Sequence, residues 1–151
     1  MRRTGAVALA FVSGVVLTGA AVQTPTMQKL DTYVAQVYVQ LRGYETELEL
    51  GEWTHTVFTG SLAEGRSLTV NVPLDNAREY FFLGVCDNDC TDLDLKVYDT
   101  NGQLVDEDLE LDDYPLLNVS AERTGMYRIE IMMVTCSENP CRFGLAAYNA
   151  E

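Results

Sequence analysis

The sequence of 151 residues is poor in basic residues and holds a single histidine, His55. Its 10 Lys and Arg stand against 23 Asp and Glu, which gives a net charge of −13. Binding a nucleic-acid backbone requires a clustered excess of basic residues, so nucleic acid is excluded as the main partner. One histidine leaves little material for a metal hydrolase, and no nucleophile-elbow motif is present to form a catalytic triad with it. The sequence encodes no recognisable reaction.

Long apolar runs are also missing, except near the N-terminus. Arg2 and Arg3 precede a mostly apolar stretch over residues 6–17, and small residues follow at 18–21. This order is typical of a secretory signal peptide, and we expect cleavage after Ala21, with cleavage after Ala20 as the close alternative. The alternative is an uncleaved membrane anchor, but the apolar stretch is shorter than the ~20 residues that a spanning helix needs.

Cleavage would leave a mature chain of 130 residues with 8 basic and 23 acidic residues, a net charge of −15. We expect this protein to be secreted or periplasmic and to be a monomer. A charge of this size repels anionic membranes and nucleic acids. The expected partner is therefore neutral, cationic or a metal ion, and no membrane contact is expected after cleavage.

The segment over residues 22–50 predicts one helix and a connector. Pro25 suits the first helical position, and apolar residues follow at spacings of three and four up to Leu41. Gly43 is a natural stop, so the helix is expected from about Pro25 to Arg42.

From Trp53 onward the apolar period becomes two, which predicts strands buried on one face. The expected strands are residues 53–59, 67–72, 79–86, 92–99, 116–121, 125–135 and 141–148, with a short one near Leu104. Turn signals such as Asn101-Gly102 separate them. Residues 51–151 are therefore predicted to form an all-β domain, a jelly-roll-like antiparallel β-sandwich of about eight strands.

Four cysteines in an exported chain indicate two disulfides. Their spacing favours the local pairs Cys86–Cys90 and Cys136–Cys141 over the two other pairings. Loops this small stabilise by about 2–3 kcal/mol each in the chain-entropy model.

Acidic residues are concentrated between Asp87 and Asp113, where eleven carboxylates accompany one lysine. Calcium relieves such repulsion and accepts six to eight oxygen ligands, although the spacing is not that of an EF-hand. The predicted ligands lie on the first disulfide loop and on one face of the next strand: Asp87, Asn88, Asp89, Asp92 and Asp94. The alternative is a solvated acidic rim that favours solubility. Asp99, at the far end of that strand, is not expected to share the site.

One series of motifs resembles the bacterial pre-peptidase C-terminal (PPC) domain. The resemblance extends over residues 53–148, and its most specific part is Asp92-Leu93-Asp94-Leu95 followed by Tyr98-Asp99 and Asn101-Gly102. It implies a β-sandwich without catalytic activity that serves secretion, targeting or substrate binding. We expect no protease domain before it in this protein, and two cysteine pairs are inserted.

Two functions follow as hypotheses. The first is a secreted, non-catalytic binding or adhesion module that recognises a glycan or peptide and binds or is stabilised by calcium. The second is an extracytoplasmic hydrolase of polysaccharide or peptide that uses paired carboxylates. A concave cleft holding two carboxylates would favour the hydrolase, because that reaction needs both groups at the scissile bond.

Overall fold

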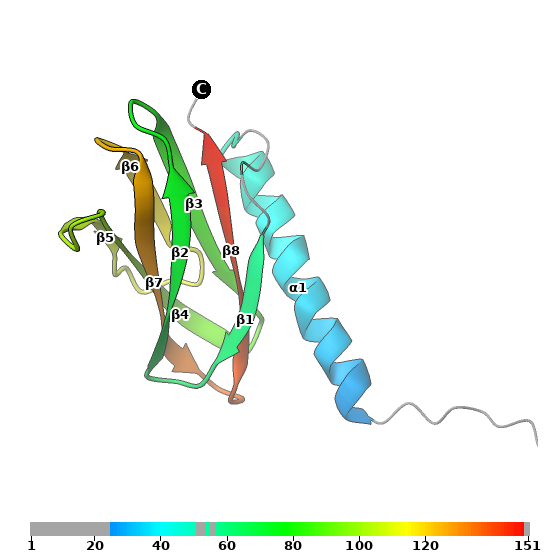
Figure 1. The fold of residues 1–151 in the computed structure, drawn as a ribbon. Helices are drawn as coiled ribbons and strands as arrows, with labels where there is room; N and C mark the ends of the chain where they lie inside the picture. The colour runs from blue at the N-terminus through cyan, green and yellow to red at the C-terminus, as the bar shows by residue number, and fades with distance from the viewer. Residues whose placement is uncertain (1–24, 51–53, 55–56, 150–151) are drawn as a thin grey trace, which may run out of the picture.

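The structure is a computed structural model that describes residues 25–50, 54 and 57–149 (Figure 1). The predicted signal peptide, Trp53 and His55 lie outside the described residues. Within the described ranges, no helix combines the length and the apolar character needed to cross a membrane.

One helix and eight strands make up the described chain. The helix α1 spans Pro25–Glu47. The strands are β1 Phe58–Leu62, β2 Arg66–Leu74, β3 Glu79–Cys86, β4 Cys90–Tyr98, β5 Leu104–Asp108, β6 Leu116–Ser120, β7 Gly125–Cys136 and β8 Cys141–Asn149. Seven of the expected strands are present with ends shifted by a few residues at most. The first strand lies further along the chain than expected, because Phe58–Leu62 are the residues that pair with β8.

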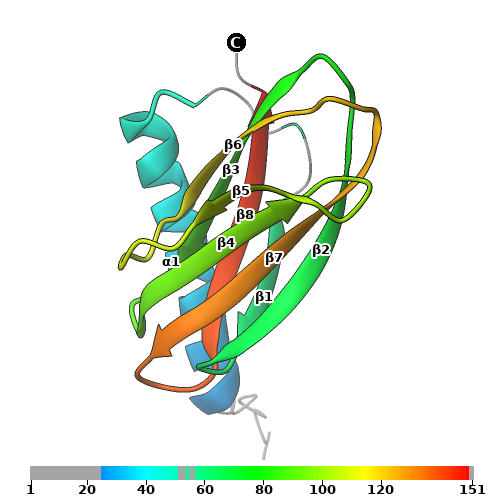
Figure 2. The same ribbon diagram turned by 90° about the vertical axis from the view of Figure 1, so that its left-hand side faces the viewer.

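The strands form two antiparallel sheets of four. The helix-side sheet has the order β1-β8-β3-β6, and the far sheet has the order β2-β7-β4-β5. Successive strands alternate between the sheets, except for β4 and β5, which are neighbours in the far sheet. This order is that of two interlocked Greek keys and confirms the predicted jelly-roll sandwich. Helix α1 lies along the outer surface of the helix-side sheet (Figures 1 and 2), and the described residues place no helix over the far sheet.

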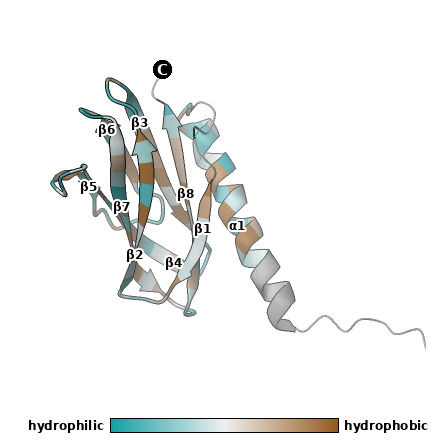
Figure 3. Cartoon of the chain, viewed as in Figure 1, coloured by the Kyte–Doolittle hydropathy of each residue, from teal (hydrophilic) through white to brown (hydrophobic). Residues whose placement is uncertain are grey.

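The core lies between the two sheets and follows the alternation read from the sequence. Leu93, Leu95 and Val97 of β4 are fully buried, as are Ile129 and Ile131 of β7. Apolar and polar residues appear as alternating bands along the strands in Figure 3. The period of two therefore decides which side chains face inward.

A second, smaller core joins α1 to the helix-side sheet. Val37 and Leu41 are buried against Leu83, Val85 and neighbouring residues of that sheet. The helix approaches closely at Gly144, where an added Cβ would lie 2.6 Å from Val37 Cγ1.

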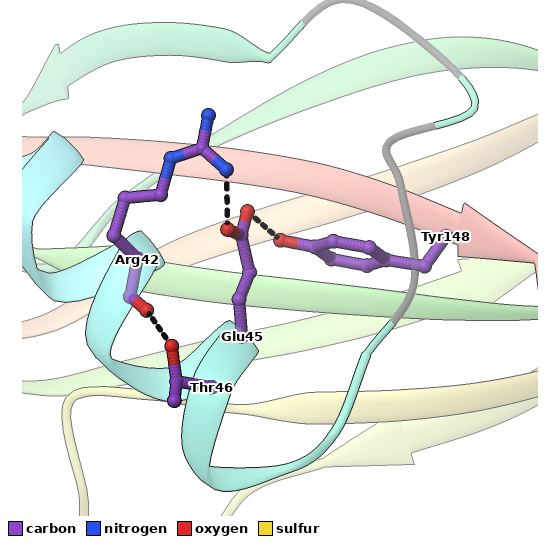
Figure 4. A network of polar contacts seen from close by, with 4 residues as sticks. All are labelled: Arg42, Glu45, Thr46 and Tyr148. Carbon is purple, nitrogen blue, oxygen red and sulfur yellow. Dashed lines mark hydrogen bonds and ion pairs between the residues drawn. The ribbon is translucent and has the colours of Figure 1, made fainter.

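The helix continues past the expected stop at Gly43 and ends at Glu47. Beyond Gly43, the Tyr44 ring stacks on Tyr114 with centroids 4.4 Å apart. Glu45 is buried, accepts a hydrogen bond from the Tyr148 hydroxyl at 2.8 Å and pairs with Arg42 at 2.8 Å (Figure 4). The helix ends where Glu49 has a φ of 53° and the Leu50 amide donates to the Glu45 carbonyl. Tertiary contacts offset the ~1 kcal/mol that a mid-helix glycine costs.

Candidate functional site

Three connections between the sheets meet at one end of the sandwich. We call this the disulfide end, made of residues 63–65, 86–90 and 136–141. Cys86 pairs with Cys90 and Cys136 with Cys141, which is the local pairing expected from the sequence. Each bond joins a strand of one sheet to a strand of the other, because β3 and β8 belong to the helix-side sheet and β4 and β7 to the far sheet.

Asp87 is a structural residue at this end. Its side chain is 1% exposed, and its carboxylate accepts the amide hydrogens of Arg142 at 2.7 Å and of Asp89 at 3.3 Å. Its own amide donates to the Arg142 carbonyl, and its carbonyl accepts from the Cys90 amide. Burial raises the pKa of Asp87, and the two amide donors lower it in part. Both carboxylate oxygens are therefore used to join the β3–β4 corner to β8.

Asn88 and Asp89 are also held by protein contacts. The Asn88 amide donates to Gln36 Oε1 at 3.2 Å, and Gln40 Nε2 donates to Asn88 Oδ1 at 3.4 Å. The Asp89 carbonyl accepts from the amide and the hydroxyl of Ser137. Helix α1 and the β7–β8 connection thus fix the β3–β4 loop, which carries three of the predicted calcium ligands.

Asp92 and Asp94 are in a different situation. They alternate with buried Leu93 and Leu95 and so lie on the outer face of the far sheet. Their exposures are only 6% and 9%, yet neither carboxylate forms a hydrogen bond or ion pair within the described part of the chain. Burial, followed by the charges of Asp92 and Asp108, raises the pKa of Asp94 to about 6.

The five predicted calcium ligands therefore fall into two groups. The electrostatic neighbours of Asp87 are Asp89 and Arg142, whereas those of Asp94 include Asp92, Asp108 and Asp112. Among the described residues, no set of three or more His, Cys, Asp or Glu is arranged to hold a metal ion. Calcium binding stays a prediction.

Much of the acidic run has a structural use that sequence reasoning missed. Asp106 and Asp108 lie on β5, at the edge of the far sheet, and accept the amide hydrogens of Asn118 and Leu116 at 3.0 and 2.9 Å. Those amides belong to β6, the edge strand of the other sheet. The two carboxylates satisfy edge groups that would otherwise be free to pair with another strand. Asp106 and Asp108 are two residues apart, so their side chains lie on the same face of β5, and this spacing could have indicated the role from the sequence.

Asp99 lies at the other end of β4, as expected. It accepts from the amides of Asn101 and Gln103, both at 2.8 Å, and closes the turn between β4 and β5. These hydrogen bonds lower its pKa.

Beside this turn lies a hollow of about 320 Å³ that the sequence did not predict. It lies between the β4–β5 turn at residues 99–103 and the β6–β7 turn at 121–124, which are on the same side of the molecule in Figure 2. We call it the turn hollow. Its lining includes Gln103, Ser120, Glu122 and Arg123, and also Tyr127, which is 2% exposed. The two turns are about twenty residues apart in sequence, so no local motif indicates it.

Comparisons with known proteins add little about function. No family model and no curated protein matches this sequence. One similar solved structure is that of Aeromonas hydrophila PliG, a periplasmic lysozyme inhibitor of g-type lysozyme. It has 10% sequence identity and a TM-score of 0.49, and the match covers 63% of this chain and 85% of that chain. At this identity and TM-score, the likeness carries no argument about function.

The raised pKa of Asp94 predicts a pH-dependent stability in chelator. The folded state binds more protons than the unfolded state between about pH 4 and pH 6, because the folded pKa is about 6 and the ordinary value is 3.8. The contribution of Asp94 to the free energy of unfolding therefore falls as pH rises through this window. Asp94→Asn should remove this fall and be more stable than wild type at pH 7.

Denaturant unfolding at a series of pH values checks this. Asp99→Asn is the matched control of opposite sign, because the folded pKa of Asp99 is lowered. That variant should be less stable than wild type at pH 7, and the difference should shrink as pH falls below 4. Identical pH profiles for Asp94→Asn and wild type would show that Asp94 is not destabilised by its surroundings.

Proposed function

We propose that this chain is an exported, non-catalytic binding module of the PPC-like kind, acting outside the cytoplasm. It recognises an extracellular glycan or peptide and has no reaction of its own. The paired disulfides support export, because such bonds persist in oxidising compartments. The jelly-roll sandwich supports the PPC-like assignment without being specific to it.

The proposal rests mainly on the hydrogen bonding of the carboxylates in the turn hollow, which does not provide the acid and base pair of a hydrolase. Asp99 and Glu122 are the acidic residues that line it. Both oxygens of Asp99 accept hydrogen bonds from the turn, and its pKa is lowered, the opposite of what a general acid requires. Of these two residues, only Glu122 has no hydrogen-bond or ion-pair partner among the described residues. Glycoside hydrolysis by the usual route needs two such groups, one of them protonated.

The hydrolase alternative can be tested directly. The oxidised protein, incubated with N-acetylchitopentaose, cellopentaose and casein, should release no products above a buffer control when monitored by chromatography. Glu122→Gln is the matched variant, because it removes the carboxylate of the turn hollow that has no partner among the described residues and keeps the side-chain shape. Product release by wild type that is lost in Glu122→Gln would contradict the proposal and establish an active site in the turn hollow.

Calcium is the proposed stabilising ion, and Asp92 and Asp94 are its best-placed ligands. Both carboxylates are nearly buried and have no hydrogen-bond or ion-pair partner among the described residues, so a cation would relieve their repulsion. Asp87, Asn88 and Asp89 complete the predicted set, but Asp87 and Asn88 would have to exchange their side-chain contacts within the corner for the ion.

Thermal unfolding in chelator and in calcium tests this ion. Wild type should gain about 2.7 kcal/mol at a hundredfold excess of calcium over its dissociation constant. Asp92→Asn combined with Asp94→Asn should gain nothing, whereas the matched control Asp106→Asn should respond as wild type does. Equal melting temperatures of wild type in both buffers would leave the acidic residues with structural and solvation roles only.

A further inference from the structure

The turn hollow has the construction of a ligand site. Its volume of about 320 Å³ is at the lower end of the range for small-ligand sites, roughly 300–1,000 Å³. It is held in shape by the Asp99 turn, where Gly102 has a φ of 83°, and by the approach of Thr100 to Gly125. A Cβ added to Gly125 would lie 2.6 Å from Thr100 Cγ2, so the two turns touch.

Tyr127 is a second observation that indicates a ligand, independent of the shape of the turn hollow. It is 98% buried and lines the hollow, but its hydroxyl has no hydrogen-bond partner within the described part of the chain. The Tyr127 hydroxyl is not completely buried. Among the described residues, the side-chain N or O atom that is completely buried and has no hydrogen-bond partner is Gln40 Oε1. A nearly buried hydroxyl normally finds a partner, since leaving it without one is costly. The hollow is where that partner can bind.

The polar groups around Tyr127 supply both donors and acceptors. Gln103, Ser120 and Arg123 have side chains with no hydrogen bond or ion pair to other described residues. Leu104 and Val105 of β5 add an apolar wall and are 48% and 42% exposed. Sugar hydroxyls both donate and accept, and the C–H faces of a sugar ring are apolar. This mixture fits a saccharide better than a purely apolar or purely charged ligand.

Charge favours a neutral ligand over an anionic one. Asp99 and Glu122 line the hollow against the single cation Arg123, and the whole chain carries −13. An acidic polysaccharide would approach against this field.

We propose that the turn hollow is a binding subsite for one or two residues of a neutral saccharide chain. The Tyr127 hydroxyl and the side chains of Gln103 and Arg123 hydrogen-bond the sugar hydroxyls, and Leu104 and Val105 contact a ring face. This inference rests on the proposed binding function and names the ligand class and the site for it.

The test is calorimetric titration and ¹⁵N NMR of the oxidised protein with N-acetylchitopentaose and cellopentaose, which are both neutral, and with pentaglycine as a peptide of similar length. Tyr127→Phe removes only the hydroxyl and keeps the buried ring, so the core is retained. Gln103→Ala changes an exposed side chain. The matched controls are Tyr148→Phe and Thr69→Ala. Tyr148 is a buried tyrosine of β8 that contacts the helix, and Thr69 is an exposed residue of β2.

At least one saccharide should bind and shift the amide signals of residues 99–105 and 120–124. Tyr127→Phe and Gln103→Ala should each weaken binding about fivefold, the effect of one hydrogen bond, and the controls should bind as wild type does. The subsite is overturned by the absence of saccharide binding up to about 10 mM, by signal shifts on another surface, or by equal binding of pentaglycine. Cleavage of a saccharide during the titration would instead overturn the non-catalytic function.

Discussion

The buried carboxylate of Asp87 is the contact on which the disulfide end depends. It joins the β3–β4 corner to β8 through the Arg142 amide and orders its own loop through the Asp89 amide. Asp87 lies within the loop closed by Cys86–Cys90, and Arg142 directly follows the Cys136–Cys141 pair in sequence. Cys90 is opposite Cys136 in the β4–β7 pairing. The Cys136 amide donates to Glu64, so the β1–β2 connection is attached to the same place. Because these connections are fixed, each strand pairs with its neighbours in the register that directs its apolar residues into the core.

The two ends of the sandwich then have different properties. At the disulfide end, the side-chain oxygens of Asp87 accept backbone amides, Asn88 Oδ1 accepts from Gln40 of the helix, and the Asn88 amide donates to Gln36 Oε1. At the other end, the turns are closed by Asp99 and by close packing of Thr100 on Gly125. The side chains of Gln103 and Arg123 there form no hydrogen bond or ion pair with other described residues. A rigid scaffold that carries adaptable turns is the usual arrangement for recognition. This contrast is the physical basis for placing ligand binding at the turn end.

The alternation of Leu93, Leu95 and Val97 with polar neighbours was enough to predict the strands, the inward faces and the sandwich. The cysteine spacing predicted the local disulfides.

Features that depend on residues distant in the chain could not be predicted from the sequence. The helix passes Gly43 because Tyr114 and Tyr148 hold its last turn. The sequence predicts Asp87 as a calcium ligand, but it could not show that this carboxylate accepts an amide hydrogen from a strand 55 residues away. The turn hollow needs two turns that only the fold brings together.

Amide hydrogen exchange of the oxidised protein tests most directly whether the disulfide end is the fixed frame. The amides of Arg142 and Cys90, which donate to Asp87, should exchange only on global unfolding, with opening free energies within about 1 kcal/mol of that for Ile131 in the central strand β7. The Asn101 amide, which donates to the Asp99 carboxylate in an exposed turn, should exchange much faster. Exchange of the Arg142 and Cys90 amides at the rate of Asn101 would contradict the account.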